Sequence, residues 1–190
     1  MKDMAGVMTG FARHVDPSLG AHLLLCGPAV TGVADDPEAA EVLDESIAIW
    51  RALPHAVRSR VHLACTPMAD PDEAAAIVNA IQRHATVVVQ KSLAEGFGLT
   101  VAEAMWKSRP VVASRIGGIQ DQVVDGESGL LLDDPTDLAA AAAAIEGLLA
   151  DPKRAARIGA AARERVRESY LGTRHLVQYM GLIGSMLDSG

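Results

Sequence analysis

Residues 86–114 read TVVVQKSLAEGFGLTVAEAMWKSRPVVAS, and this stretch holds one complete unit of strand, loop, helix and second strand. The apolar runs at 86–90 and 110–114 are short, valine-rich and uninterrupted, which is typical of strands that are buried on both faces of a sheet. Segment 99–107 between them is predicted to be a short helix. A buried strand that returns to the sheet through a helix indicates parallel pairing with right-handed crossovers.

The rest of the chain repeats this alternation. Further strand-like runs lie at 21–26, 61–64 and 129–132. The predicted helices cover 4–15, 37–53 and 173–187, and three more begin at Pro71, at Asp134-Pro135 and at Pro152. We therefore predict an α/β fold, with a Rossmann-like parallel sheet covered by helices on both faces and a single domain over residues 1–190.

The chain enters this pattern on a helix, because Met4, Met8, Phe11 and Val15 recur at helical spacing. In a doubly wound sheet a strand comes first and usually lies at the centre. We therefore expect that the first strand is missing and that these residues are part of a longer protein. Unpaired strand edges tend to recruit another chain, so a homo-oligomer is expected.

Composition excludes several classes of function. The chain has 49% hydrophobic and 22% charged residues, as globular proteins do, and its 17 Lys and Arg against 24 Asp and Glu give a net charge of −7. This charge disfavours nucleic acid as a partner. No apolar run reaches the ~18 residues of a membrane helix, and no secretion signal is recognisable, so we expect a cytoplasmic protein without a membrane partner.

Metal and disulfide chemistry are not indicated. Cys26 and Cys65 have neither zinc-ligand nor disulfide-framework spacing, and we expect both to be buried free thiols. The histidines form no HExxH motif and no i, i+4 pair, so no metal site is predicted.

Two glutamates mark the loop of the opening stretch. Glu95 and Glu103 stand eight positions apart, with Gly96 and Gly98 between them. Parallel sheets bind ligands beyond the carboxyl ends of their strands, and the N–H groups at the start of a helix there suit a diphosphate. Glu103 has an equally good structural explanation, because Thr100-x-x-Glu103 has the spacing of a helix capping box.

A second glycine loop, residues 114–122, follows the next strand and faces the same edge of the sheet. Gly117 and Gly118 could turn N–H groups toward an anion, and a plain turn is an equally good interpretation. Because the two loops leave neighbouring strands, we expect them to flank one cleft.

The motifs EGFGLTVAE (95–103) and GGIQDQVVDGESGLLL (117–132) resemble the C-terminal, nucleotide-sugar-binding domain of retaining glycosyltransferases of the GT-B fold. That family includes glycogen, sucrose and trehalose synthases, and its signature is a Glu-x7-Glu pair. Residues 79–107 together with 26–38 resemble, more narrowly, the trehalose synthases that join glucose from a nucleoside diphosphate glucose to free glucose. The likeness runs over nearly the whole chain.

The resemblance implies a role for each site residue. Glu95, the expected catalytic residue, would hydrogen-bond hydroxyls of the donor glucose, and Glu103 would bind the ribose. Lys2 matches a lysine that the family places against the phosphates. The implied donor-binding set is Glu95, Gly96, Phe97, Gly98, Leu99, Thr100, Glu103 and Lys2, with Gly117 and Gly118 as a phosphate or acceptor loop.

The chain departs from the family pattern at Gln120, where many relatives carry glutamate after the glycine pair. Lys91 stands where relatives often have an apolar or polar residue, and no role is assigned to it.

The resemblance also implies the reaction, in which the diphosphate leaves and the anomeric configuration is kept. The N-terminal acceptor domain is absent from these 190 residues, so the chain is expected to have little transferase activity alone. The donor would be ADP-, UDP- or GDP-glucose, with no tightly bound cofactor and with room for Mg²⁺ beside the diphosphate. The alternatives are a trehalose phosphorylase, a transferase with another acceptor, and a non-catalytic remnant that oligomerises without binding sugar nucleotides.

Overall fold

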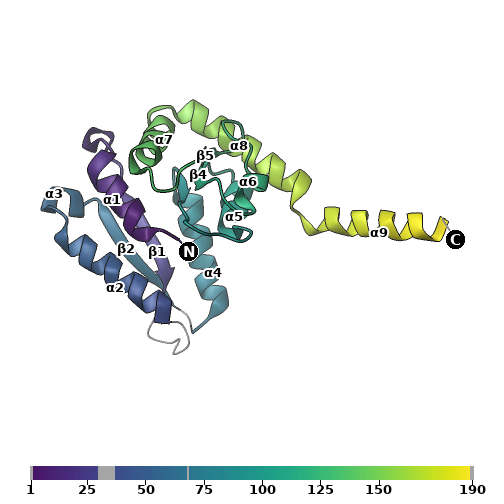
Figure 1. Cartoon of the computed structure of the whole chain (residues 1–190), viewed down its shortest axis with the longest axis horizontal. Coiled ribbons are helices and arrows are strands. Elements are labelled where there is room, and N and C mark those ends of the chain that lie inside the picture. Colours follow the sequence, from purple (N-terminus) through teal and green to yellow (C-terminus); the bar gives the residue numbers. More distant parts are fainter. Residues whose placement is uncertain (1, 30–36, 68, 189–190) are drawn as a thin grey trace.

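The computed structural model describes residues 2–29, 37–67 and 69–188, arranged as parallel strands flanked by helices (Figure 1). The segment 26–38, which contributes to the family resemblance, therefore lies partly outside the described residues. The strands, in chain order, are β1 (Leu23–Pro28), β2 (Val61–Thr66), β3 (Val88–Gln90), β4 (Val111–Ser114) and β5 (Leu130–Leu132). All of their pairings are parallel, as predicted, with β1 beside β2 and β4 between β3 and β5.

The helices fall close to their predicted positions, except for the short helices His55–Arg58 and Ile119–Gln122, which were not predicted. They are α1 (Met4–His14), α2 (Pro37–Ala52), α3 (His55–Arg58), α4 (Pro71–His84), α5 (Leu99–Trp106), α6 (Ile119–Gln122), α7 (Leu138–Ala150), α8 (Pro152–Ser169) and α9 (Gly172–Asp188), with a 3₁₀ turn at Pro17–Leu19. The predicted start at Asp134-Pro135 is wrong. Helix α7 begins at Leu138, because the Asp137 carboxylate caps it by accepting from the Ala140 N–H, whereas Asp134 accepts from Thr136 in a separate turn.

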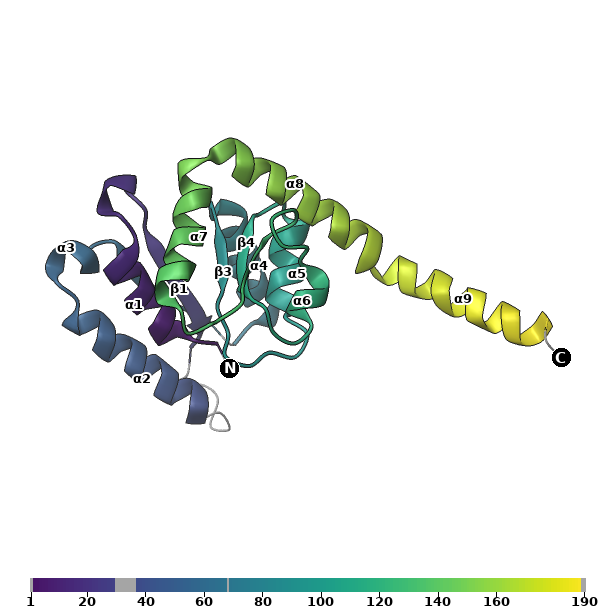
Figure 2. The same ribbon diagram turned by 45° about the horizontal axis from the view of Figure 1, so that its top comes forward.

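The sheet is divided into two parts that lie side by side (Figure 2). Within the described residues β1 pairs with β2 and β3 pairs with β4, and no hydrogen-bonded ladder joins β1 to β3. The single sheet that was expected is thus present as two separate ladders in the described residues.

The core is deepest around β4. All four residues of this strand are buried, with α5 and α8 packed over Val111 and Ala113 on one side and α7 and α8 over Val112 on the other. In contrast, β1 and β2 bury one face, where Leu25 and Val61 contact α1 and α2. Their opposite face is open to solvent at His22, Leu24 and His62, so these two strands are covered less completely than β4.

The thiols correct one expectation. Cys65 is exposed and Cys26 is half-buried, so the prediction of two buried cysteines is wrong, although both are free thiols. Both side chains lie near the carboxyl ends of β1 and β2, at the edge of the less covered sheet.

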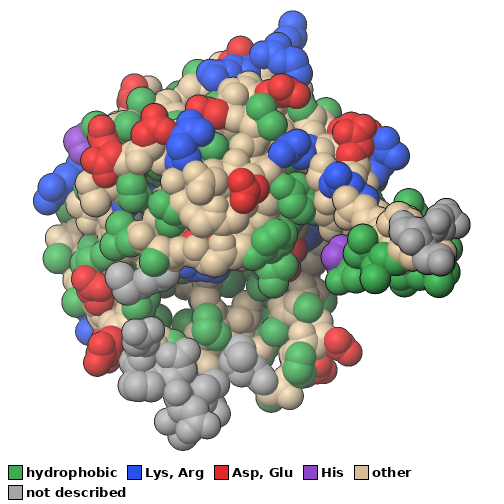
Figure 3. All heavy atoms as spheres, turned by 45° about the vertical axis from the view of Figure 1, so that its right-hand side comes forward, with side chains coloured by type: hydrophobic (Ala, Val, Ile, Leu, Met, Phe, Trp, Pro, Cys, Tyr) green, Lys and Arg blue, Asp and Glu red, His purple; other side chains and the backbone are tan. Residues whose placement is uncertain are grey.

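Helix α9 projects from the body of the molecule (Figures 1 and 3). Its exposed apolar side chains include Leu176, Val177, Met180 and Leu187. None of the helices in the described ranges is long and apolar enough to span a membrane.

Candidate functional site

The site is centred on the Glu95 loop, defined here as residues 91–98, which joins the carboxyl end of β3 to α5. The Glu95 carboxylate is fixed by residues at the end of the strand: its Oε2 accepts from Gln90 Nε2 at 3.2 Å and from Ser92 Oγ at 3.5 Å. Gln90 and Ser92 are buried. Glu95 Oε1 accepts from the Gly96 N–H at 3.2 Å, and Glu95 itself is half-buried. A carboxylate held in this way is oriented before any ligand arrives.

Helix α5 begins without a side-chain cap. Its N-cap is Gly98, in the left-handed conformation at φ 83°, and within the described part of the chain no side chain accepts from its first turn. A Cβ at Gly98 would come 2.7 Å from Ile119 Cγ1, so both the backbone angle and the space require glycine. The N–H groups at this helix start therefore remain available to an anion.

The capping-box interpretation of Glu103 is wrong. Because α5 begins at Leu99, Thr100 lies inside the helix and cannot serve as its N-cap. Glu103 Oε2 instead accepts from Gln82 Nε2 on α4, at 3.4 Å. Helix capping, the alternative explanation for Glu103, is therefore excluded.

Glu103 belongs to a polar chain between α4 and α5. Lys107 Nζ donates to Gln82 Oε1 at 2.6 Å, and the buried Gln82 amide in turn donates to Glu103. Burial lowers the pKa of Lys107, the Glu103 carboxylate opposes that shift, and Arg83 adds to it. A cavity of about 420 Å³ opens here, lined by Ala74, Ala75, Val78, Asn79, Glu103 and Lys107.

The structure brings the two glycine loops together. The Gly118 N–H donates to Gly96 O at 2.6 Å, and Gln122 Nε2 donates to the carbonyl of Phe97. A Cβ at Gly117, whose φ is 49°, would overlap the carbonyl oxygen of Glu95. The Gly118 N–H is therefore already hydrogen-bonded within the protein, and the second glycine loop packs against the backbone of the Glu95 loop.

Lys2 reaches this site from the other end of the chain. Its Nζ lies 3.5 Å from Thr100 Oγ1 in the first turn of α5, and its backbone forms an antiparallel bridge with Ser92. Lys2 is exposed, so its ammonium is accessible to a ligand beside the first turn of α5.

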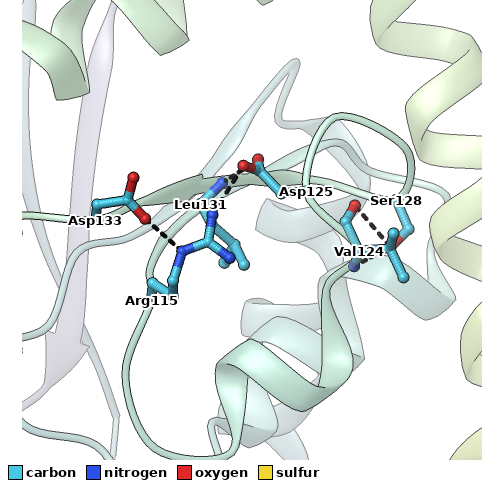
Figure 4. A network of polar contacts seen from close by, with 6 residues as sticks. All are labelled: Arg115, Val124, Asp125, Ser128, Leu131 and Asp133. Carbon is cyan, nitrogen blue, oxygen red and sulfur yellow. Dashed lines mark hydrogen bonds and ion pairs between the residues drawn. The ribbon is translucent and has the colours of Figure 1, made fainter.

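Two features of the site were missed by sequence reasoning. Lys91 is buried and forms an ion pair with Asp3, a partner 88 positions away that no local pattern could reveal. Arg115, directly after β4, pairs with Asp133 and Asp125 (Figure 4). The bond to Asp133 is the largest cause of a raised Arg115 pKa. The network ties the carboxyl ends of β4 and β5 together at the start of the second glycine loop.

Comparisons with known proteins agree with this architecture. Residues 70–165 match the family described as Glycosyl transferases group 1. Trehalose synthase from Pyrococcus horikoshii is 44% identical over 109 residues, which are 57% of this chain and 26% of that protein. The chain thus spans about a quarter of that relative's length.

Solved structures share the fold over the full length of this chain. Sucrose-phosphate synthase from Thermosynechococcus elongatus superimposes with a TM-score of 0.74 and 28% identity, covering 100% of this chain and 43% of that one. Anabaena Alr3699/HepE, solved in complex with UDP-glucose, has a TM-score of 0.64 and 20% identity, and the match covers 100% of this chain and 46% of that protein.

Proposed function

Since the chain belongs to the glycosyl transferases group 1 family, we propose that it is the donor-binding part of a retaining glucosyltransferase. The donor is a nucleoside diphosphate glucose, held at Glu95, at the start of α5 and at Glu103. The observation that carries this proposal is the meeting of an uncapped helix start, a lysine ammonium and two carboxylates at the carboxyl edge of one sheet.

The diphosphate is assigned to the first turn of α5. The N–H groups of residues 97–100 carry the positive end of the helix dipole, and the Lys2 ammonium lies beside them. As the bond to the sugar breaks, negative charge grows on the leaving diphosphate, and donors already pointing there stabilise it without reorganisation. In this assignment Lys2 and the start of α5 supply positive charge to the diphosphate.

The two carboxylates are assigned to hydroxyl groups at either end of the donor. Each carboxylate oxygen can accept about two hydrogen bonds. Gln90 and Ser92 fill Glu95 Oε2, whereas Oε1 receives one bond from Gly96 and keeps an acceptor position for a glucose hydroxyl. Glu103 is exposed, and its Oε1 takes no part in the contact with Gln82, so it is free to accept from a ribose hydroxyl.

The acceptor in this proposal is free glucose, which makes trehalose the product with retained configuration. The likeness to a protein named trehalose synthase supports this choice. About three quarters of that relative lies outside the match, and the acceptor site is assigned to that part of a complete enzyme. The 190-residue chain alone should therefore bind donor and form little trehalose.

The test is calorimetric titration of the 190-residue chain with ADP-, UDP- and GDP-glucose. We expect saturable heat with at least one of them. Glu103→Ala should weaken that binding at least ~10-fold, the effect of losing about 1.4 kcal/mol. The free energy of unfolding should fall by about 1–3 kcal/mol, because this side chain caps no helix but the buried Gln82 amide loses its acceptor.

Glu127→Ala is the matched control, since Glu127 is an exposed glutamate in the turn before β5. It should leave both the affinity and the stability unchanged. The proposal fails if none of the three nucleotide sugars gives heat, and the assignment of Glu103 fails if Glu103→Ala binds as tightly as the unaltered chain.

A further inference from the structure

A buried ion pair lies at the first residue of the Glu95 loop. Lys91 follows the last residue of β3, and its side chain is only 1% exposed. The ammonium bonds to Asp3 Oδ2, on a side chain that is 17% exposed. Burying a lysine charge is costly unless a partner compensates it, so Asp3 and Lys91 depend on each other.

The same two residues are joined through their backbones. The Asp3 N–H donates to Lys91 O at 3.0 Å, and the neighbouring Lys2 bridges to Ser92. The second carboxylate oxygen of Asp3 accepts from the Gly6 N–H at 2.8 Å and so caps α1. One aspartate therefore fixes the direction of α1 and attaches its start to the Glu95 loop.

Gly6 shows how closely this arrangement is fitted. Glycine inside a helix costs about 1 kcal/mol relative to alanine, so its presence in the first turn of α1 calls for a reason. A Cβ there would overlap Asp3 Oδ2 and come 2.6 Å from Lys91 Nζ. The ion pair occupies the space that any larger residue at position 6 would need.

Lys91 cannot meet a ligand itself, because its side chain is sealed from solvent. The adjacent Lys2 can, since it is exposed and its Nζ lies 3.5 Å from Thr100 Oγ1 at the start of α5. We propose that Lys91 and Asp3 are positioning residues, whose ion pair holds the Lys2 ammonium in place to bind the donor diphosphate. This inference rests on the proposed function of the site.

A double-mutant cycle on donor affinity tests the proposal, with the nucleotide sugar among the three above that binds the unaltered chain. Lys2→Gln removes the ammonium and should weaken binding about tenfold, as expected for one charge-assisted hydrogen bond. Lys91→Met should weaken it by a similar factor. The double variant should be no weaker than either single variant, because a displaced Lys2 has no contribution left to lose.

A lysine that merely stabilises the fold gives a different result. In that case Lys91→Met lowers the thermal midpoint of unfolding. Its effect on donor affinity is then either absent or independent of Lys2→Gln, so that the double variant loses the product of the two fold-changes. Either outcome overturns the proposal, as does a Lys2→Gln variant that binds normally. Absence of binding by the unaltered chain would instead contradict the proposed function itself.

Lys91→Met leaves the Asp3 carboxylate without its partner, which could unfold the variant. Two further variants therefore separate a loss of positioning from a loss of folding. The Asp3→Asn, Lys91→Met double variant removes both charges together and should fold, yet lose about tenfold in affinity. Gly6→Ala keeps both charges but displaces the pair, and the same loss is expected. If either variant binds as tightly as the unaltered chain, the ion pair has no positioning role.

Discussion

The β3–β5 region and the β1–β2 region are built from the same alternation of strands and helices, yet they differ in how completely their strands are buried. Every residue of β4 is inaccessible to solvent, whereas Leu24 on β1 is 43% exposed and His22 and His62 lie on an open face. The loops of the proposed donor site leave the buried region. The difference indicates that the strands covered on both faces hold the loops of the site in a fixed position.

The less covered region contributes to the site at one place. Lys2 and Asp3 precede α1, which packs on β1 and α2, and they attach to residues 91–92 of the Glu95 loop. The cation beside the helix start is therefore supplied by one region and the helix by the other. The predictions below test this division, from the largest expected effect to the smallest.

Matched leucine truncations test the difference in burial. Leu148 is fully buried against the β4–β5 sheet, so Leu148→Ala should lower the free energy of unfolding by about 2–5 kcal/mol. Leu24→Ala should cost less than about 1 kcal/mol, because Leu24 is already 43% exposed. Urea denaturation of both variants measures the two costs, and equal values would show that the regions are packed alike.

Glycine replacements test the contact between the two loops of the buried region. Gly117 and Gly126 both have positive φ, so alanine strains either by about 1–2 kcal/mol. At Gly117 the new Cβ would also overlap the carbonyl of Glu95, whereas at Gly126 it meets open space. Gly117→Ala should therefore cost about 1–2 kcal/mol more than Gly126→Ala and also weaken donor binding. Equal stabilities and equal affinities would show that this loop contact is not needed.

Thiol modification tests access to the β1–β2 region without altering the sequence. Burial raises the pKa of Cys26, the neighbouring Cys65 adds to the shift, and Lys2 opposes it. Less thiolate is then present near neutral pH, so Cys26 should react more slowly than the exposed Cys65. Two equally slow reactions with a disulfide reagent would contradict the difference in exposure between the two thiols.

The parts of the fold that depend on local patterns could be predicted from the sequence. Strand positions followed the apolar runs, and α4 begins at Pro71 as predicted, where Asp70 caps it by accepting from the N–H groups of Asp72 and Glu73. The start of α5 at Leu99 was also predicted, but its cap was not, because the capping-box spacing favoured Thr100 as the N-cap. The N-cap is instead Gly98, whose positive φ and close approach to Ile119 leave no room for a side chain.

The candidate site, too, was predictable only where its residues are close together in the sequence. The Glu-x7-Glu spacing and the glycines identified the loop, since those residues are neighbours in sequence. The ion pair of Lys91 with Asp3 and the approach of Lys2 to Thr100 join residues 88 and 98 positions apart. Such pairs leave no periodic signal in a single sequence, so only the folded chain reveals them.

The most direct test of the central claim is amide hydrogen exchange with and without saturating nucleoside diphosphate glucose. The account predicts that the N–H groups of residues 97–100 exchange more slowly when donor is bound, because the diphosphate accepts hydrogen bonds at the uncapped start of α5, while β1 is unaffected. Unchanged exchange at residues 97–100 in a chain that demonstrably holds the donor would contradict it.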